Sequence, residues 1–397
     1  MAVRRRTRRR GVRIAVLRAL AVTPGSSARS LLPALAKVLD GHDSALVPVP
    51  AGADRRSELS ALRVGDDIDD DIALVVTTSG TTGAPKGALL TAAALTASAA
   101  ATHDRLGGPG RWLLALPPYH IAGVQVLVRS LLSGTVPVEL DVSTGFDITE
   151  FASAVRELGS GRRYTALVAA QLAKTLTDSA ATAALADLDA VLIGGGPAPR
   201  PLLDAAASAG ITVVGTYGMS ETAGGCIYDG VPLDGVRLRV DPDGRIVIGG
   251  ATLAKGYRNP PDPDPFAEPG WFRTDDIGAV DDSGVLSVLG RADEAISTGG
   301  LTVLPQPVEA ALRTHPAVAD CAVFGLADVR LGQRVVAAVV ATAGCPAPTL
   351  ETLRAHVARS LDGTAAPREL HIVDGLPMRG IGKVDRHALA RRFSRGA

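Results

Sequence analysis

Short apolar runs alternate with alanine-rich stretches over the first half of the chain. Residues 72–76 (IALVV), 190–193 (AVLI) and 211–214 (ITVV) are apolar runs of strand length, and each is followed by a loop rich in glycine or threonine. The alanine-rich stretches 92–102 and 202–208 have the composition of helices. Strands that alternate with helices favour a mainly parallel sheet covered on both faces, with ligands at the carboxyl ends of its strands. The pattern therefore predicts an α/β fold in which these loops converge on one crevice.

The pattern changes after about residue 230. Residues 236–250 (VRLRVDPDGRIVIGG) and 279–290 (AVDDSGVLSVLG) place Asp-Gly and Ser-Gly turns between alternating runs, which is typical of antiparallel hairpins. The Pro- and Asp-rich segment 258–270 is expected to be a surface loop. A smaller α+β unit is expected from about residue 294. Its predicted elements are a helix near 306–314, strands near 318–324 and 334–341, and a helix near 350–361.

Composition and charge exclude several classes of function. The 397 residues are 46% hydrophobic and have a formal net charge of zero, so nothing favours nucleic acid or an anionic membrane as a partner. Aromatic residues make up only 3%, too few for the stacking platforms of single-strand binders. No apolar stretch reaches membrane-spanning length. Cys226, Cys321 and Cys345 form no CxxC pair, which argues against a disulfide framework or a zinc site and favours a reducing, cytoplasmic location.

The N-terminus, MAVRRRTRRRGVRIAVLRALAV, begins with a run of arginines. A secretory signal peptide needs an uninterrupted apolar segment, which Arg13 and Arg18 break here. Residues 1–15 are therefore expected to be a disordered basic tail.

The segment VVTTSGTTGAPKGALLT, residues 75–91, turns from an apolar run into hydroxyls, glycines and one lysine. Hydroxyls and the backbone N–H groups of a glycine-rich loop can wrap an anion, although the Walker A spacing is absent. Lysine is rare in this arginine-rich chain, so a lysine in the loop is informative. A polar turn after a strand is the alternative interpretation. The residues expected at the anion are Thr78, Ser79, Gly80, Thr81, Thr82, Gly83 and Lys86.

Two other motifs place carboxylates after apolar runs. In TYGMSETAGG (216–225), Glu221 is suited to hold Mg²⁺ against phosphate oxygens and Tyr217 to flank a base. In GWFRTDDIG (270–278), the carboxylates of Asp275 and Asp276 are suited to hydrogen-bond ribose hydroxyls. A solvated glutamate and a turn with exposed acids are the alternative interpretations.

Basic groups occur in three further motifs, LPPYHIAG (116–123), LGRADEAISTGG (289–300) and GIGKVDRHAL (380–389). Lys383 lies between Gly382 and Val384, and its ammonium suits a site where a carboxylate meets a phosphate. An exposed surface lysine is the alternative. His120 follows a proline pair, and an isolated histidine is more often structural than catalytic.

Together, these loops and their order resemble the AMP-forming adenylating superfamily of acyl-CoA synthetases, adenylation domains and luciferases. The resemblance extends from about residue 72 to about residue 390 and is most specific in TTSGTTGAPKG. It implies that this first loop wraps the phosphates of ATP. The GGGPAP (194–199) and TYGMSET loops would frame adenine and the α-phosphate. The nucleotide-binding residues implied in these two loops are Gly195, Gly196, Pro197, Thr216, Tyr217, Gly218, Met219 and Ser220.

The same resemblance assigns roles to residues outside these loops. Glu221 would be the Mg²⁺ ligand, and Asp276 and Arg291 would hold the ribose. Asp293 occupies the position of the hinge between domains, and Lys383 matches the lysine essential for adenylation.

The resemblance implies a fold of class α/β plus α+β. Residues 16–292 would form a large N-terminal nucleotide- and acyl-binding domain with mixed sheets covered by helices. Residues 293–397 would form a small, mobile C-terminal α+β domain that carries the catalytic lysine.

A narrower resemblance is to the short actinobacterial form of the o-succinylbenzoate–CoA ligases of menaquinone biosynthesis. It is carried by LALPPYHIAGVQVLVRSLLSG, RRYTALVAAQLAK and TYGMSETAGGCIYDGVPLDGV, and by a stretch of only about 76 residues before the phosphate loop. Asp275 departs from this family's usual glycine. Leu301, Thr302 and Pro307 replace its common Glu, Asn and Glu on the surface used in the thiol step. The acyl-substrate residues implied are His120, Gly123, Lys174, Thr222 and Gly224, with His120 and Lys174 as candidates for the second carboxylate.

The expected reaction joins 2-succinylbenzoate to coenzyme A through an acyl-adenylate, and it uses ATP and Mg²⁺. The expected partners are therefore small molecules. A homodimer is one oligomeric state left open. A CoA ligase for another aryl or medium-chain acid, a peptide-synthetase adenylation domain and a catalytically inactive nucleotide-binding homologue are the alternatives.

Overall fold

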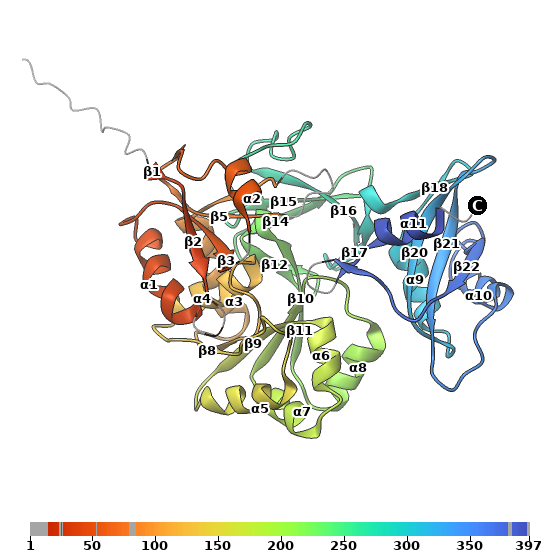
Figure 1. Cartoon of the computed structure of the whole chain (residues 1–397), viewed down its shortest axis with the longest axis horizontal. Helices are drawn as coiled ribbons and strands as arrows, with labels where there is room; N and C mark the ends of the chain where they lie inside the picture. The colour runs from red at the N-terminus through yellow and green to blue at the C-terminus, as the bar shows by residue number, and fades with distance from the viewer. Residues whose placement is uncertain are drawn as a thin grey trace, which may run out of the picture.

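The computed structural model describes residues 15–23, 25, 27–52, 54–78, 85–379 and 383–394. Figure 1 shows a large N-terminal part, coloured red to green, and a smaller C-terminal part in blue beside the strand β17 (Leu286–Arg291). The basic tail expected at residues 1–15 lies outside the described residues apart from Ala15, which begins β1 (Ala15–Val16).

In the described part of the chain, a four-stranded sheet leads to the first motif. The elements of this region are β1, β2 (Arg18–Val22), α1 (Ser27–Leu39), β3 (Leu46–Pro50), α2 (Arg56–Ala61), β4 (Asp67–Ile68), β5 (Ile72–Val76) and β6 (Ala88–Thr91). The sheet order is β2-β3-β5-β6, with β2, β3 and β5 parallel and β6 antiparallel to β5. All five residues of β5 are buried, as expected for an apolar run covered on both faces. The strand predicted at 72–76 is confirmed.

A second sheet, seven-stranded within the described residues, forms the middle of the molecule. The elements of this region are α3 (Ala92–Arg105), β7 (Arg111–Leu114), α4 (Ile121–Leu132), β8 (Val138–Glu139), α5 (Ile148–Glu157), β9 (Arg163–Val168), α6 (Ala169–Thr175), α7 (Ser179–Ala186), β10 (Ala190–Gly194), α8 (Arg200–Ser208), β11 (Val213–Met219), η1 (Ser220–Thr222), β12 (Gly224–Tyr228) and β13 (Val231–Pro232). The order β13-β12-β11-β10-β9-β7-β8 is parallel from β11 to β8. Leu192 packs with α3 and α4, whereas its neighbour Val191 packs with α5 to α8. Helices therefore cover both faces, and the mainly parallel sheet and the two helices predicted here are confirmed.

The third predicted strand is shifted and longer than expected. The apolar run 211–214 predicts its position, but β11 begins at Val213 and continues to Met219. The antiparallel partner β12 pairs with β11 as far as Met219, so the ladder extends into polar, glycine-containing residues that give no strand signal. The residues expected in a loop from Thr216 to Met219 therefore lie within a strand.

The two predicted hairpins form an antiparallel sheet, four-stranded in the described residues. Its strands are β14 (Val236–Val240), β15 (Arg245–Gly250), β16 (Trp271–Val280) and β17. Their order follows the sequence, with the expected turns at Gly244 and Gly284. The segment 258–270 contains no helix or strand, which confirms the predicted loop. Asp275 and Asp276 lie within β16 rather than in a turn, because β16 continues through both residues and pairs with β17 from Asp276 to Val280.

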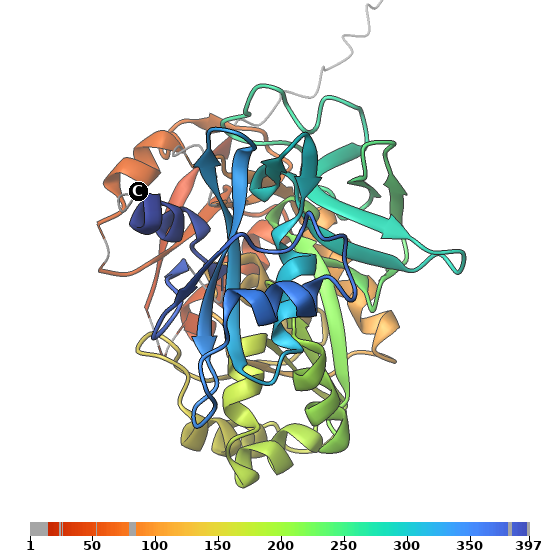
Figure 2. The same ribbon diagram turned by 90° about the vertical axis from the view of Figure 1, so that its right-hand side faces the viewer.

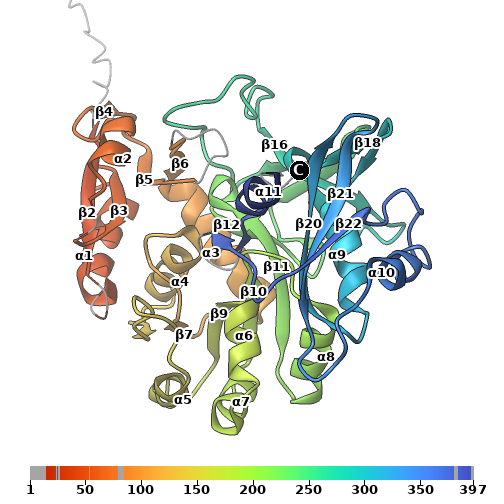
Figure 3. The ribbon, with the colours of Figure 1, turned by 45° about the vertical axis from the view of Figure 1, so that its right-hand side comes forward.

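The C-terminal part is an α+β unit, as predicted. Its elements are η2 (Ala292–Glu294), β18 (Ile296–Thr298), β19 (Leu301–Val303), α9 (Pro305–Arg313), β20 (Val318–Asp328), β21 (Gly332–Ala341), α10 (Leu350–Val357), β22 (Glu369–Ile372), β23 (Met378–Arg379), β24 (Lys383–Val384) and α11 (Arg386–Ser394). The antiparallel pair β20–β21 is its centre and stands in front of the large part in Figure 2. α9 and α10 pack on one face and α11 on the other (Figure 3). The expected domain boundary, between residues 292 and 293, falls in η2.

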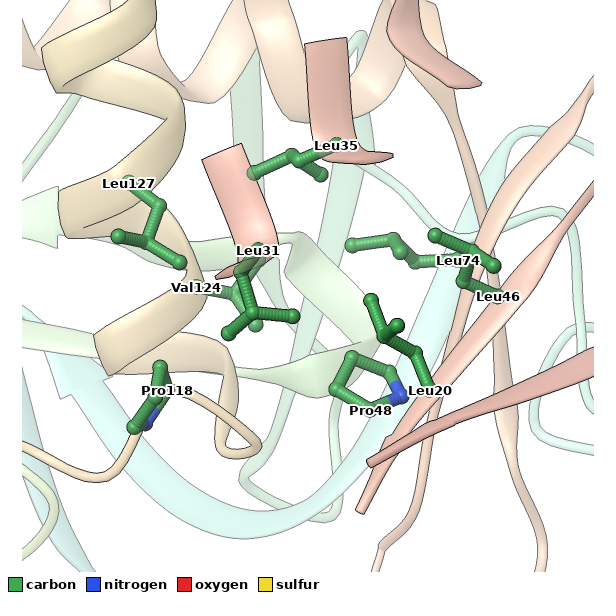
Figure 4. A pocket seen from close by; sticks show the side chains of 9 residues that line it. All are labelled: Leu20, Leu31, Leu35, Leu46, Pro48, Leu74, Pro118, Val124 and Leu127. Atoms are coloured by element: carbon green, nitrogen blue, oxygen red, sulfur yellow. The ribbon is translucent and has the colours of Figure 1, made fainter. Parts of the chain in front are cut away.

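Apolar side chains of the first sheet, α1 and α4 surround a small gap in the core of the large part. Figure 4 shows an apolar cavity of about 10 Å³ between the first sheet and α4. Its lining residues are Leu20, Leu31, Leu35, Leu46, Pro48, Leu74, Pro118, Val124 and Leu127. None of the helices in the described ranges combines the length and continuous apolar character that crossing a bilayer requires.

Candidate active site

The threonine-rich motif follows the buried strand β5, as the sequence predicts. Ser79, Gly80, Thr81, Thr82 and Gly83 lie outside the described residues. The hydroxyl of Thr78, at the near end of this loop, is buried and has no hydrogen-bond partner within the described part of the chain. Lys86, at its far end, is half-buried, and Gly87 follows in a left-handed conformation with φ +68°. An orphaned hydroxyl and an ammonium at the two ends of the loop fit an anion such as a phosphate.

The second and third motifs are neighbours because β10 and β11 are parallel and adjacent. The hydroxyl of Thr216 donates to the Ile193 carbonyl at 3.1 Å. Gly195 takes a φ of +80°, which begins the turn that continues through Gly196 and Pro197. In the next strand, Gly218 is required by packing, since a Cβ there would lie 2.1 Å from the Gly224 carbonyl oxygen. The structure thus brings the two loops together, as predicted.

The expected ribose ligands form a connected group. The Tyr217 hydroxyl donates to Asp276 Oδ2 at 2.7 Å, and Arg291 Nη1 approaches Asp276 Oδ1 at 3.5 Å. Asp276 and Arg291 are direct partners on β16 and β17, so the sheet register sets this contact. Burial and the charge of Asp276 raise the pKa of Tyr217, which keeps its hydroxyl protonated as a donor.

Arg291 also reaches the expected hinge. Its Nε and Nη2 donate to the two carboxylate oxygens of Asp293, each at 2.8 Å. Burial would lower the pKa of Arg291, but the hydrogen bonds and charges of Asp293, Asp276 and Asp275 raise it overall. One guanidinium therefore joins the expected ribose carboxylate to the expected hinge residue.

Asp275, which departs from the family's usual glycine, has ion-pair partners of its own. It contacts Arg245 Nη1 at 2.9 Å and Arg291 Nη2 at 3.7 Å. The side chain is exposed in the middle of β16, so its charge lies on the rim of the site and is compensated by these two arginines.

Glu221, the expected Mg²⁺ ligand, lies in η1 and is only 7% exposed. Tyr257 donates its hydroxyl to Glu221 Oε1 at 2.6 Å, and the Lys86 ammonium lies 5.5 Å from the centroid of the same ring. Mg²⁺ in nucleotide sites needs one or two protein carboxylates, because phosphates and water supply the remaining ligands. A buried, oriented glutamate beside the end of the phosphate loop fits that requirement. Met219 and Ser220 lead into this turn.

The residues expected at the acyl group surround the start of α4 and the turn after η1. His120 is the N-terminal cap residue of α4, with its ring 4.8 Å from that of Tyr119. Packing alone requires glycine at Gly123, where a Cβ would lie 2.3 Å from the Pro117 carbonyl oxygen. The Thr222 hydroxyl is committed to the backbone of Met219 and Gly224, which shapes this turn.

The structure places Lys174 differently from the other acyl residues. Lys174 lies in the last turn of α6, the helix that follows β9 directly, and its side chain is exposed. The Lys174 ammonium there donates to the Phe146 carbonyl oxygen at 2.5 Å.

Lys383 lies in β24, paired with β23, and its side chain lies outside what the structure describes. The helix α11, which begins three residues later, is held in place by the contacts of its first residue, Arg386. Arg386 Nη2 contacts both carboxylate oxygens of the buried Glu309, at 2.8 and 2.9 Å, and its Nη1 contacts Glu294 at 2.9 Å. Burial raises the pKa of Glu309 although Arg386 opposes the shift.

Two residues of this site are not predicted from the sequence, Tyr257 and Arg386. Tyr257 follows Lys255 and Gly256, so the only local signal is a scarce tyrosine beside one of the rare lysines. Arg386 lies in the quoted Lys383 motif but is one of many arginines, so nothing in the sequence marks it out.

Comparisons with known proteins agree with this geometry. Residues 18–258 match the AMP-binding enzyme family and residues 307–383 match the AMP-binding enzyme C-terminal domain. A Mycobacterium tuberculosis protein described as a probable 2-succinylbenzoate–CoA ligase is 77% identical over 380 residues, 95% of this chain and 99% of that protein. A 2-succinylbenzoate–CoA ligase from a Geobacillus species is 36% identical over 81% of this chain and 69% of its own length.

A solved structure shares the fold. The o-succinylbenzoate coenzyme A synthetase of Bacillus subtilis, in complex with ATP and magnesium ion, superposes with a TM-score of 0.77 at 24% identity, over 94% of this chain and 89% of that one. The chain therefore belongs to the AMP-binding enzyme family, whose N-terminal and C-terminal domains are both present in it.

Proposed function

We propose that this chain is a 2-succinylbenzoate–CoA ligase of menaquinone biosynthesis. The reaction converts ATP, 2-succinylbenzoate and CoA into 2-succinylbenzoyl-CoA, AMP and diphosphate. The observation that carries the proposal is the 77% identity to the Mycobacterium tuberculosis relative along almost the whole of both chains. The geometry supports the adenylating part of the proposal, since residues that the resemblance assigns to the nucleotide lie on the neighbouring strands β10 and β11 and in contact with β16.

The first half-reaction forms an acyl-adenylate. The succinyl carboxylate of the substrate attacks the α-phosphorus of ATP, the bond to the β-phosphate oxygen breaks, and diphosphate leaves. Lys86, Thr78 and the loop between them hold the phosphates, and Asp276 and Arg291 hold the ribose. Glu221 would hold Mg²⁺, which when bound would supply positive charge against the phosphates. The Lys383 ammonium stabilises the charge where the carboxylate meets the α-phosphate.

The second half-reaction forms the thioester. The C-terminal domain turns about Asp293, which withdraws Lys383 and admits CoA. The CoA thiolate attacks the carbonyl carbon of the acyl-adenylate, and AMP leaves with the bridging oxygen. Arg291 donates to both carboxylate oxygens of Asp293, so the pair would connect the ribose to this rotation.

Several finer points belong to the same proposal. His120 is the proposed partner of the second carboxylate of the substrate.

Cys226 and Cys321 are buried free thiols and Cys345 is an exposed one, which fits the reducing cytoplasm where ATP and CoA are available. The partners are small molecules, and a homodimer is proposed only as the oligomeric state to test first by light scattering.

The experiment that tests the function is diphosphate release with a panel of carboxylic acids. 2-Succinylbenzoate, benzoate and hexanoate are each supplied with ATP, Mg²⁺ and CoA, and the thioester is detected by mass. Diphosphate release and a thioester of the expected mass with 2-succinylbenzoate alone support the proposal. Equal turnover with benzoate or hexanoate contradicts the substrate and favours a CoA ligase for another acid. Diphosphate release without any thioester contradicts the ligase and favours another adenylating reaction.

A further inference from the structure

Tyr257 makes a buried hydrogen bond for which the reaction as described has no use. The side chain is 9% exposed and its partner Glu221 is 7% exposed. The distance of 2.6 Å from its hydroxyl to Glu221 Oε1 is that of a short hydrogen bond between a phenol and a carboxylate. Such a bond fixes the direction of the carboxylate, because the plane of the carboxyl group must follow its donor.

The ring of Tyr257 has a second role at the same place. The Lys86 ammonium lies 5.5 Å from its centroid, within the range of a cation–π contact. Phe266 packs against the ring edge-on, with the centroids 5.3 Å apart, and Phe272 supports Phe266. The ring is thus held between a phenylalanine pair and the lysine at the end of the phosphate loop.

The backbone around Tyr257 is anchored to both partners. Tyr257 forms a bridge with Ala88, and Leu89 N donates to the Gly256 carbonyl at 2.9 Å. On its other side, Ala254 N donates to the Glu221 carbonyl, also at 2.9 Å. The segment 254–257 therefore fixes the distance between the end of the phosphate loop and the turn that carries Glu221.

We infer that Tyr257 is a positioning residue that sets Glu221 and Lys86 in one arrangement around the phosphates of metal-bound ATP. Its hydroxyl orients the carboxylate toward the metal, and its ring supports the ammonium. The inference rests on the proposed function only in that ATP binds together with a divalent cation.

Two substitutions separate the two contacts. Tyr257→Phe removes the hydroxyl and keeps the ring, whereas Tyr257→Leu removes both. Tyr228→Phe is the matched control, because Tyr228 is fully buried and its hydroxyl contacts Thr102 and Arg129, away from Glu221 and Lys86. Thermal unfolding of each variant measures how much of any effect is general destabilisation.

The probe is ATP with and without Mn²⁺, measured by calorimetry in the absence of acid and CoA. The quantity of interest is the affinity for ATP with Mn²⁺ divided by the affinity for ATP without Mn²⁺. This ratio reports how well the site holds the metal on the nucleotide. Tyr257→Phe should lower this ratio about tenfold and leave the affinity for metal-free ATP within about twofold. Tyr257→Leu should also weaken metal-free ATP about fivefold, because Lys86 loses its ring. Tyr228→Phe should change neither quantity.

A double-substitution cycle tests that the effect passes through Glu221. Glu221→Gln with Tyr257→Phe should be no worse than Glu221→Gln alone. An unchanged affinity ratio in Tyr257→Phe, additive losses in the double variant, or an equal loss in Tyr228→Phe would each overturn the inference. Because no acid is present, these outcomes are independent of whether 2-succinylbenzoate is the substrate, which the thioester assay decides separately.

Discussion

The site has two sides, and each is built on a carboxylate that accepts a hydrogen bond from a tyrosine. On the side proposed to bind the phosphates, called the phosphate side, Tyr257 donates to Glu221 at 2.6 Å. On the side proposed to bind the ribose, called the ribose side, Tyr217 donates to Asp276 at 2.7 Å. The two sides differ in what lies behind the tyrosine. Tyr257 is anchored to the residues that follow the threonine-rich loop, whereas Asp276 is paired across the sheet with Arg291, which holds Asp293, the proposed hinge residue.

This difference separates two tasks. The phosphate side is fixed within the large part of the molecule, so it can hold a metal and phosphates in one geometry throughout a reaction cycle. The ribose side is connected to the residue about which the C-terminal part is proposed to turn. We therefore expect substitutions on the phosphate side to change chemistry, and substitutions on the ribose side to change nucleotide affinity and domain movement.

The largest effect is expected from the residue that belongs to neither side. Lys383→Ala should slow adenylate formation about 1,000-fold, because the Lys383 ammonium is proposed to stabilise the charge where the carboxylate meets the α-phosphate. Thioester formation from supplied acyl-adenylate should stay within about threefold, since the proposed rotation withdraws Lys383 before that step. Diphosphate release and thioester formation are measured separately, with the exposed Lys37→Ala as control. Equal loss of both half-reactions would contradict the rotation.

The second test compares the two carboxylates directly. Glu221→Gln should lower kcat for diphosphate release about 100-fold, because a bound Mg²⁺ would lose its negatively charged ligand from the protein. Asp276→Asn should instead raise KM for ATP about tenfold with little change in kcat, because the ribose contact is made equally in ground and transition states. Steady-state kinetics at varied ATP and Mg²⁺ measure both. If the two variants shift the same parameter, the division into two sides is wrong.

Substitution of Arg291 should have a smaller effect, and it tests whether the ribose side also acts on the domain movement. Arg291→Ala should raise KM for ATP about fivefold and also slow thioester formation from supplied acyl-adenylate by about the same factor, because Asp293 loses its bidentate partner. Arg291→Lys should not restore the rate of thioester formation, since an ammonium cannot make the bidentate contact with Asp293. Asp276→Asn should leave the thioester step unchanged. Rapid-quench measurement of that step alone distinguishes an arginine that acts on the hinge from one that acts on the ribose only.

The smallest effect is expected at Asp275. Asp275→Gly removes ion pairs with Arg245 and Arg291 at an exposed position, and such pairs are worth less than about 1 kcal/mol each. The free energy of unfolding should fall by less than about 2 kcal/mol, and KM for ATP should stay within about twofold. Chemical denaturation and ATP kinetics check both values. A larger loss would mean that Asp275 supports Arg291 in its contacts with the ribose side.

Much of the fold follows from local patterns in the sequence. The run 72–76 is a strand because its five apolar residues must all be buried, and the hairpin 236–250 forms because Asp-Gly turns suit tight antiparallel connections. β11 was harder to predict, since its second half is polar and glycine-containing and becomes a strand only because β12 pairs with it. The same is true of Asp276, whose sequence suggests a turn but whose neighbours place it inside a ladder.

The order of residues along the chain establishes which chemical groups this protein has and the family to which it belongs, because the glycine, hydroxyl and lysine pattern of residues 77–87 is local and specific. How those groups are held depends on the folded chain. Tyr257 reaches Glu221, and Arg386 reaches Glu309, from 36 and 77 residues away along the chain. No local pattern encodes such contacts, because they depend on the register of strands and on the close packing of segments that are distant in sequence.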